Sequence, residues 1–128
     1  MSRVKRLQHT SVPMPPGGSD AARAFYGETL GMPEIQKPEG LRDLTVVWFR
    51  AGEDGDEVHC FEDATDGPRT TSQHLCLEVE DIDWFRAQLA ERGIPTEETE
   101  TIYNRPRFFV RDPFGNRVEL TQILGDFV

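Results

Sequence analysis

Alternating apolar and polar positions predict strands in several short segments of this chain. In residues 72–79 (SQHLCLEV), every second side chain is apolar, which places His74, Cys76 and Glu78 together on the opposite face. Similar patterns predict the other strands, with turns at GEDG and DPFG between neighbours. The predicted strands cover Val4 to Met14, a short stretch from Pro33 to Lys37, and residues 44–52, 56–63, 72–79, 106–112 and 116–123.

Two segments with apolar side chains at helical spacing predict one helix in each half of the chain. The first covers residues 21–30 (AARAFYGETL) after the candidate N-caps Ser19 and Asp20. The second covers residues 82–93 (IDWFRAQLAERG), starting at Asp81 or Asp83. We expect both helices to cover a sheet with their apolar sides. The side chains predicted to face it are Ala21, Ala24, Phe25, Leu30, Trp84, Phe85 and Leu89.

The order of elements repeats, which predicts an α+β fold of two βαβββ modules. LQHTSVP in the first half is echoed by SQHLCLEV in the second, and GDEVHCFE is echoed by GNRVELTQ. The modules would span residues 1–64 and 70–128 of a single domain, with DATDGPRTT between them. We expect a curved mixed sheet with the helices on its convex face. Its concave face would form a pocket.

The repeat also aligns the residues best suited to bind a metal. It places His9 over His74 and His59 over Glu119. His9, His59 and His74 are the only histidines of the chain. Alternation puts all four side chains on the sheet face opposite the helices. Imidazole and carboxylate together suit a divalent first-row metal ion. A metal-free binding pocket is the alternative interpretation of the same face.

Composition and charge narrow the choice of partners. A chain of 128 residues that is 37% hydrophobic and 29% charged is typical of a soluble globular protein. Neither a membrane-spanning run nor a signal peptide is evident, so we expect a cytoplasmic protein without a membrane partner. The net charge of −9 argues against a nucleic-acid partner. Cys60 and Cys76 lack CxxC spacing and are predicted to be buried, reduced thiols.

Two motifs resemble a known superfamily over essentially the whole chain. The closing VRDPFGNRVEL and the helix AFYGETLGMP, with its Phe25, Tyr26, Leu30 and Gly31, accompany the two βαβββ modules. Together they resemble the glyoxalase/bleomycin-resistance/extradiol-dioxygenase superfamily, which has the vicinal oxygen chelate fold. DPFGN itself is interpreted as a structural turn, with Asp112, Gly115 and Asn116 as turn residues.

The resemblance implies a divalent metal ion (Zn, Ni, Mn or Fe) bound from the first, fourth, fifth and eighth strands. In this sequence those strands offer His9, His59, His74 and Glu119. Of these, His9, His74 and Glu119 match the two-His-one-carboxylate set of fosfomycin-resistance enzymes and extradiol dioxygenases. The chain departs from glyoxalase I-like members at His59, where Glu or Gln is frequent. His59 could therefore bind metal, bind substrate or act as a base. The resemblance also implies a homodimer.

Further residues are candidates for contact with a small-molecule substrate. Phe61 shares the face of His59 and would line the pocket. Tyr103, Arg105 and Arg107 lie in TIYNRPRFF, where arginines could bind an anionic group. Trp48, Phe49, Phe108 and Phe109 lie in strands, so alternation divides them between core and pocket. PTEETE is predicted to be a solvated loop.

These features predict a metalloenzyme of glyoxalase type that performs isomerase or lyase chemistry on an oxygen-bearing small molecule. The metal would polarise the substrate, and the catalytic candidates are Glu57, as a base, and Glu119. One alternative is an extradiol-type Fe(II) dioxygenase, because the facial triad suits non-haem iron. Another is a metal-free protein that confers resistance by sequestering an antibiotic such as bleomycin.

Overall fold

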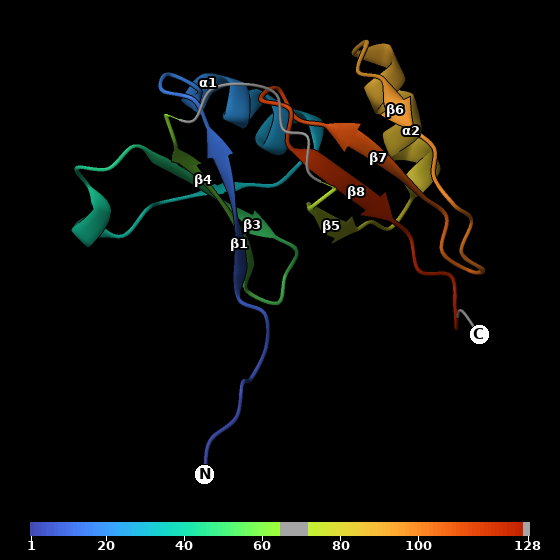
Figure 1. Cartoon of the computed structure of the whole chain (residues 1–128), viewed down its shortest axis with the longest axis horizontal. Coiled ribbons are helices and arrows are strands. Elements are labelled where there is room, and N and C mark those ends of the chain that lie inside the picture. The colour runs from blue at the N-terminus through green and yellow to red at the C-terminus, as the bar shows by residue number, and fades with distance from the viewer. Residues whose placement is uncertain (65–71, 127–128) are drawn as a thin grey trace. The chain divides into compact units, whose positions relative to one another are not determined.

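The computed structural model describes residues 1–64 and 72–126. The chain divides into two compact units, residues 1–65 and 66–128. Each unit contains a four-stranded mixed sheet and a helical segment (Figure 1). The predicted α+β class with two repeated modules is therefore confirmed. Most of the predicted linker, residues 65–71, lies outside the described residues.

The first unit has the strand order β1-β4-β3-β2, in which β1 and β4 are parallel and the other pairs antiparallel. Its elements are β1 (His9–Met14), the helix α1 (Ser19–Ala22), the π-helix η1 (Arg23–Thr29), β2 (Glu34–Ile35), the 3-10 helix η2 (Glu39–Leu41), β3 (Val46–Ala51) and β4 (Asp56–Glu62). The first strand is shorter than predicted. Val4 and Leu7 are 91% and 83% exposed, so no packing holds residues 4–8 in the sheet.

The second unit repeats this topology with the strand order β5-β8-β7-β6 and a parallel β5–β8 pair. Its elements are β5 (His74–Glu78), α2 (Ile82–Glu91), β6 (Thr96–Glu97), β7 (Arg107–Arg111) and β8 (Arg117–Thr121). The prediction of a loop at PTEETE is wrong in part. Thr96 and Glu97 form β6 because they pair with Val110 and Phe109 of β7, and ladder hydrogen bonds outweigh the polar composition.

The first predicted helix differs from an ordinary α-helix. After one α-helical turn the chain continues as a π-helix, in which the Leu30 amide donates to the Phe25 carbonyl over 2.9 Å. The wider turn changes which side chains are buried. Phe25 and Tyr26 are 3% and 0% exposed, whereas Ala24, predicted to face the sheet, is exposed. Tyr26 contacts Phe49 of β3, with 5.9 Å between ring centroids.

The second helix begins as predicted, because the Asp81 side chain accepts a hydrogen bond from the Trp84 amide over 3.2 Å. Ile82 and Leu89 are buried. Trp84, predicted to face the sheet, is 52% exposed. Arg86 instead covers Phe108, with its guanidinium carbon 4.5 Å from the ring centroid. The helix therefore packs on the sheet face that carries Phe108.

The closing DPFGN motif forms a tight turn between β7 and β8, as predicted. Both carboxylate oxygens of Asp112 accept hydrogen bonds: Oδ1 from the amides of Phe114 (3.0 Å) and Asn116 (2.7 Å), and Oδ2 from the Asn116 side chain (2.8 Å). Gly115 has φ +89°, which a glycine adopts without strain. The turn determines the register in which β8 pairs with β7.

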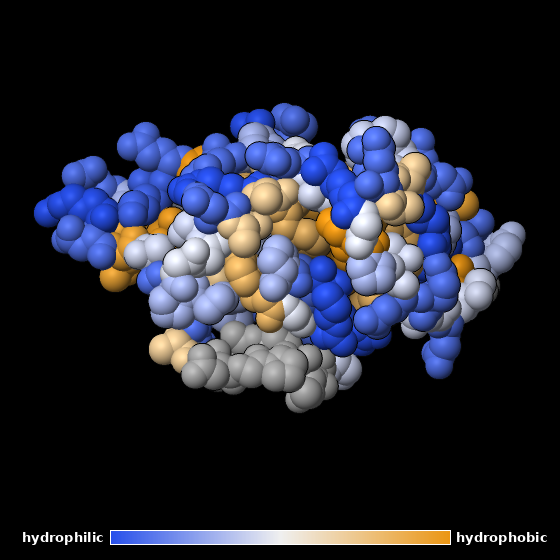
Figure 2. Space-filling model, turned by 90° about the horizontal axis from the view of Figure 1, so that it is seen from above, coloured by the Kyte–Doolittle hydropathy of each residue, from blue (hydrophilic) through white to orange (hydrophobic). Residues whose placement is uncertain are grey.

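The surface agrees with the polar composition. Hydrophilic side chains cover much of the face in Figure 2, with smaller apolar patches between them. Within residues 1–64 and 72–126, no helix is long and apolar enough to cross a bilayer. Both cysteines are free thiols, but only Cys60 is buried. The prediction of burial is wrong for Cys76, because its side chain points away from the helix-covered face.

Candidate functional site

The candidate ligands occupy equivalent positions in the two sheets. In the first unit His9 pairs with Glu57 and Ser11 pairs with His59. In the second unit His74 pairs with Arg117 and Cys76 pairs with Glu119. In each parallel pair, the residue two positions after the histidine pairs with the second candidate ligand. Ser11 pairs with His59, and Cys76 pairs with Glu119. The alignment of His9 with His74 and of His59 with Glu119 is confirmed by this register.

In the first unit His59 lies in a stack of aromatic rings. Its ring centroid is 3.6 Å from that of Trp48, with 5° between the planes, and 4.1 Å from that of His9. His59 Nε2 and Glu57 Oε1 are 2.8 Å apart, so the imidazole donates to the carboxylate. Only 8% of His59 is exposed. The stack and the hydrogen bond hold this imidazole in one orientation.

The environment shifts the pKa of both members of this pair. Desolvation by the stacked rings lowers the pKa of His59 below its usual 6.5, and the nearby His9 acts in the same direction. The hydrogen bond that His59 donates to Glu57 opposes this shift without reversing it. For Glu57, the hydrogen bond from His59 lowers the carboxyl pKa. At neutral pH the pair is therefore a neutral imidazole beside a carboxylate.

The lowered pKa of His59 predicts a loss of stability in acid. The folded protein binds a proton at His59 less readily than the unfolded chain, so the contribution is complete above about pH 6.5 and declines as the pH falls toward the folded-state pKa. We expect NMR titration of metal-free protein to show His59 titrating below an ordinary histidine. Trp48→Ala should move the His59 pKa toward 6.5, because it exposes the ring. An unchanged His59 pKa in that variant would contradict desolvation as the cause.

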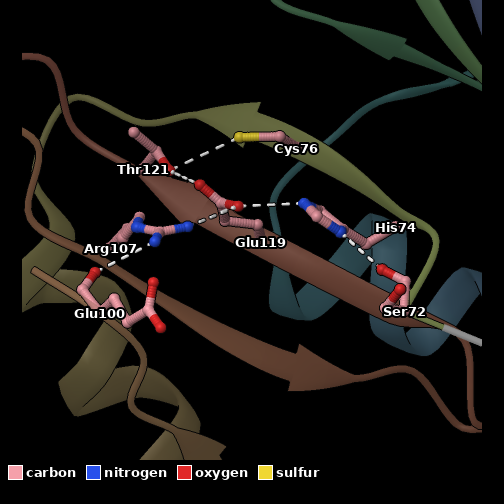
Figure 3. A network of polar contacts seen from close by, with 7 residues as sticks. All are labelled: Ser72, His74, Cys76, Glu100, Arg107, Glu119 and Thr121. Carbon is pink, nitrogen blue, oxygen red and sulfur yellow. Dashed lines mark hydrogen bonds and ion pairs between the residues drawn. The ribbon is translucent and has the colours of Figure 1, made fainter. Parts of the chain in front are cut away.

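In the second unit, a network of polar contacts surrounds Glu119 (Figure 3). Its Oε1 lies 3.1 Å from His74 Nε2 and 3.3 Å from Arg107 Nη1. Its Oε2 accepts a hydrogen bond from the Thr121 hydroxyl at 2.5 Å, and the Cys76 thiol donates to that hydroxyl at 3.5 Å. Glu119 is 7% exposed. The carboxylate is thus mostly removed from water and held from several sides.

These contacts keep Glu119 ionised. Burial alone would raise the pKa of Glu119, but the hydrogen bonds from Thr121 and Cys76 and the charges of Arg107 and His74 outweigh it. The net result is a pKa below the ordinary value. An oriented carboxylate that is ionised at neutral pH suits a metal ligand. It is a weak general base, because basicity falls with pKa.

In His9 and His74 the same ring nitrogen, Nδ1, is committed as a hydrogen-bond donor. His74 Nδ1 lies 2.9 Å from the Ser72 carbonyl oxygen, which can only accept, so Nδ1 carries a proton. His9 Nδ1 lies 2.6 Å from Gln8 Oε1 and is a donor by the same argument. In the neutral imidazole, Nε2 then carries the lone pair. This tautomer, fixed by an oxygen acceptor behind the ring, is typical of metal-binding histidines.

The second-unit pair, His74 and Glu119, has donor types that a divalent metal ion accepts. Its Nε2-to-Oε1 separation of 3.1 Å is an ordinary hydrogen-bond distance, and a tetrahedral ion about 2.1 Å from each atom would set them ~3.4 Å apart. Across residues 1–64 and 72–126, however, no three histidine, cysteine, aspartate or glutamate side chains gather closely enough to hold a metal. The candidate ligands instead form two pairs: His9 with His59 in the first unit, and His74 with Glu119 in the second.

The other predicted site residues divide into two groups. Arg107 contacts Glu119 directly and also donates from Nη2 to the Glu100 carbonyl at 3.0 Å. Phe61 lies two residues after His59 on the same strand face and is half-buried. Arg105 is half-buried in a short bridge with Ile102. Tyr103 is 69% exposed, and within the described ranges no contact to the predicted ligands is found.

Sequence reasoning missed several partners of the candidate ligands. Alternation places Arg117 and Thr121 on the face of Glu119, so pattern alone could have identified them. Trp48 was left undecided between core and pocket, and it lies on the same sheet face as His59, with which it pairs and stacks. The Ser72 carbonyl carries no signal in the sequence, because any residue supplies a backbone oxygen.

Comparisons with known proteins now identify the class. The model of the Glyoxalase/Bleomycin resistance protein/Dioxygenase superfamily matches residues 6–120. This chain belongs to that superfamily, and its fold is the vicinal oxygen chelate fold. The search of curated proteins finds no match.

Among solved structures, a glyoxalase family protein from Bacillus anthracis is 35% identical, with a TM-score of 0.86 and coverage of 96% of this chain and 98% of that one. A lactoylglutathione lyase from Agrobacterium tumefaciens is 24% identical, with a TM-score of 0.70 and coverage of 94% and 96%. A genomically encoded fosfomycin resistance protein from Listeria monocytogenes is 14% identical, with a TM-score of 0.73 and coverage of 94% of each chain. The last two show likeness of fold alone.

Proposed function

We propose that this protein is a metal-dependent enzyme that performs isomerase or lyase chemistry on a small molecule carrying adjacent oxygen atoms. The ligand set we propose is His9, His74 and Glu119. The observation that carries the proposal is the common tautomer of the two repeat-equivalent histidines, which leaves Nε2 of each with a lone pair. In His74, Nε2 lies 3.1 Å from the ionised carboxylate of Glu119, so a proton on Nε2 holds the pair together until a metal ion displaces it. Two electron-rich atoms facing each other are stabilised when a cation binds both.

His59 has a different role in this proposal. Its Nε2 is committed to Glu57, and its Nδ1 has no hydrogen-bond partner in the part of the chain that the structure describes. A neutral imidazole with one nitrogen open is a suitable proton acceptor. Glu57 then orients the ring and stabilises the charge it gains, as carboxylates do behind catalytic histidines. We therefore assign Glu57 to positioning and His59 to proton transfer, with Glu119 as a ligand.

A bound divalent ion would supply Lewis-acid polarisation of the substrate's oxygens. Zn, Ni, Mn and Fe are all compatible with two imidazoles and one carboxylate. Of the alternatives, a metal-free binding protein is favoured by one observation: no described cluster contains three donors. An Fe(II) dioxygenase would need the same three ligands as the isomerase or lyase. Cytoplasmic location and a homodimer belong to the proposal as well.

The test is metal binding by the full chain, measured by calorimetry after removal of metal. We expect one site for Zn²⁺, Ni²⁺, Mn²⁺ or Fe²⁺. His9→Ala and His74→Ala should weaken affinity at least ~100-fold, and His59→Ala about tenfold or less, because first-sphere ligands outweigh neighbouring groups. Glu78→Ala, which removes an exposed side chain from the same face of β5, is the matched control. Absence of binding by all four ions, or equal affinities of His74→Ala and Glu78→Ala, would refute the metalloenzyme.

A further inference from the structure

Arg117 is a cation beside the candidate metal ligands, and the described residues provide it with no counter-charge. Strands β7 and β8 carry three arginines. Arg107 forms an ion pair with Glu119 at 3.3 Å, and Arg111 forms one with Glu97 at 3.6 Å. For Arg117, neither an ion pair nor a side-chain hydrogen bond is found within residues 1–64 and 72–126. Its charge is therefore available to a ligand.

One ring fixes the position of this guanidinium. Its central carbon lies 3.6 Å from the centroid of Phe109, so the two planar groups are in close contact. Phe109 is 3% exposed although it lies on the polar face, and His74 meets the same ring edge-on at 4.9 Å between centroids. Arg117 and His74 are also paired residues of parallel strands, so their side chains leave the sheet on the same face. The arginine thus lies next to a proposed metal ligand.

One N–H donor of Arg117, at Nε, is energetically costly to leave without a hydrogen-bond acceptor. Its Nε is buried and has no hydrogen-bond partner in the described structure. The same is true of Arg107 Nε, although both Nη atoms of that residue are occupied by Glu119 and Glu100. A buried N–H without an acceptor is unfavourable and is rare in folded proteins. A shift of the guanidinium that brought this N–H to an incoming acceptor on this face would relieve that cost.

We propose that Arg117 is the anion-binding residue of the site and that the substrate carries an oxyanion group, a carboxylate or a phosphonate. A guanidinium presents two parallel N–H groups that match two oxygens of such a group. The anion lies against Arg117 over Phe109, while the rest of the substrate reaches His74 and Glu119. The local charge is decisive because the chain as a whole carries −9 and would otherwise repel an anion.

The inference rests on the proposed function only in making the anion part of the substrate, and anion binding can be tested without metal. The experiment titrates metal-free full-length protein with methylphosphonate, inorganic phosphate and acetate and follows the ¹H–¹⁵N NMR signals. We expect at least one of these probes to shift the Arg117 Nε–H signal and the amide signals of Phe109 and His74. Arg117→Met should weaken that binding about tenfold or more, because charge-assisted hydrogen bonds are lost. Arg117→Lys should retain part of it.

Arg92→Met is the matched control, because it removes the same charge from the same unit at the end of α2, on the other side of the sheet. Its anion affinity should stay within about twofold of wild type. Equal loss of anion binding in Arg92→Met and Arg117→Met would overturn the proposal, and so would the absence of probe binding to wild type. A wild type that binds anions through Arg117 but no metal would refute the proposed function while leaving the anion site intact.

Discussion

Replacing Glu119 with glutamine should abolish metal binding and destabilise the protein at the same time. Glutamine keeps the shape of the side chain but removes the charge that faces His74 and Arg107. The Arg107 and Glu119 side chains are only 16% and 10% exposed, so Arg107 would remain mostly buried without its anion. We expect the free energy of unfolding to fall by about 2–3 kcal/mol. Metal affinity should fall at least ~100-fold, because the amide oxygen lacks the negative charge that the carboxylate offers a divalent ion.

A second substitution separates these two effects. In the double variant Arg107→Met, Glu119→Gln, the unpaired buried charge is gone, so most of the lost stability should return while metal binding does not. Urea unfolding of metal-free protein measures the first effect, and calorimetry with Zn²⁺ the second. Glu78→Gln, on the same face but exposed, is the control for both. If the double variant were as unstable as Glu119→Gln alone, the buried charge would not be the cause.

Removing the carboxylate of Asp112 should cost about as much stability, although this residue touches no ligand. Asp112 is 4% exposed and accepts three hydrogen bonds from Phe114 and Asn116. Asp112→Ala leaves those donors without that acceptor inside a buried turn. We expect a loss of about 2–4 kcal/mol in the free energy of unfolding. The same turn determines the register of β8, so both Arg117 and Glu119 depend on it.

Denaturant unfolding in the absence of metal measures this loss. Asp112→Asn retains one oxygen acceptor and should lie between alanine and wild type. Asp54→Ala is the matched control, because Asp54 is an exposed aspartate in the turn between β3 and β4. If Asp112→Ala and Asp54→Ala unfolded with the same denaturant midpoint, the turn would not hold the second sheet in register.

Much of the fold could be predicted because side-chain alternation survives in nearly every strand. The pattern that separates Leu75 from His74 also determines which face meets the helix. Alternation fails where pairing rather than composition decides, as in β6, whose Thr96 and Glu97 carry no apolar signal. It also fails at the first helix, because periodicity assumes 3.6 residues per turn and the π-helix from Arg23 to Thr29 does not have that spacing.

The candidate site was predictable in its ligands and less so in their surroundings. The repeat located His9, His59, His74 and Glu119 because it aligns residues of known metal chemistry. It could not indicate that Glu57 and Trp48 together restrain His59, since those contacts depend on rotamers and on a neighbouring strand. Arg117 was overlooked because an arginine in a turn-and-strand motif is usually solvated. The structure distinguishes it because Arg107 and Arg111 form ion pairs, whereas none is found for Arg117 among the described residues.

The π-helix also bears on how this chain can be aligned and altered. Successive residues of an α-helix point about 100° apart, and the larger number of residues per turn in a π-helix brings Phe25 and Tyr26, both buried, closer in direction. The wider turn that permits this uses more residues than an α-helix of the same rise. A one-residue deletion between Arg23 and Thr29 would let the segment close as an ordinary helix and turn one of the two aromatic rings toward water. A relative with a single gap at this place should therefore have an apolar and a polar residue where this chain has Phe25 and Tyr26.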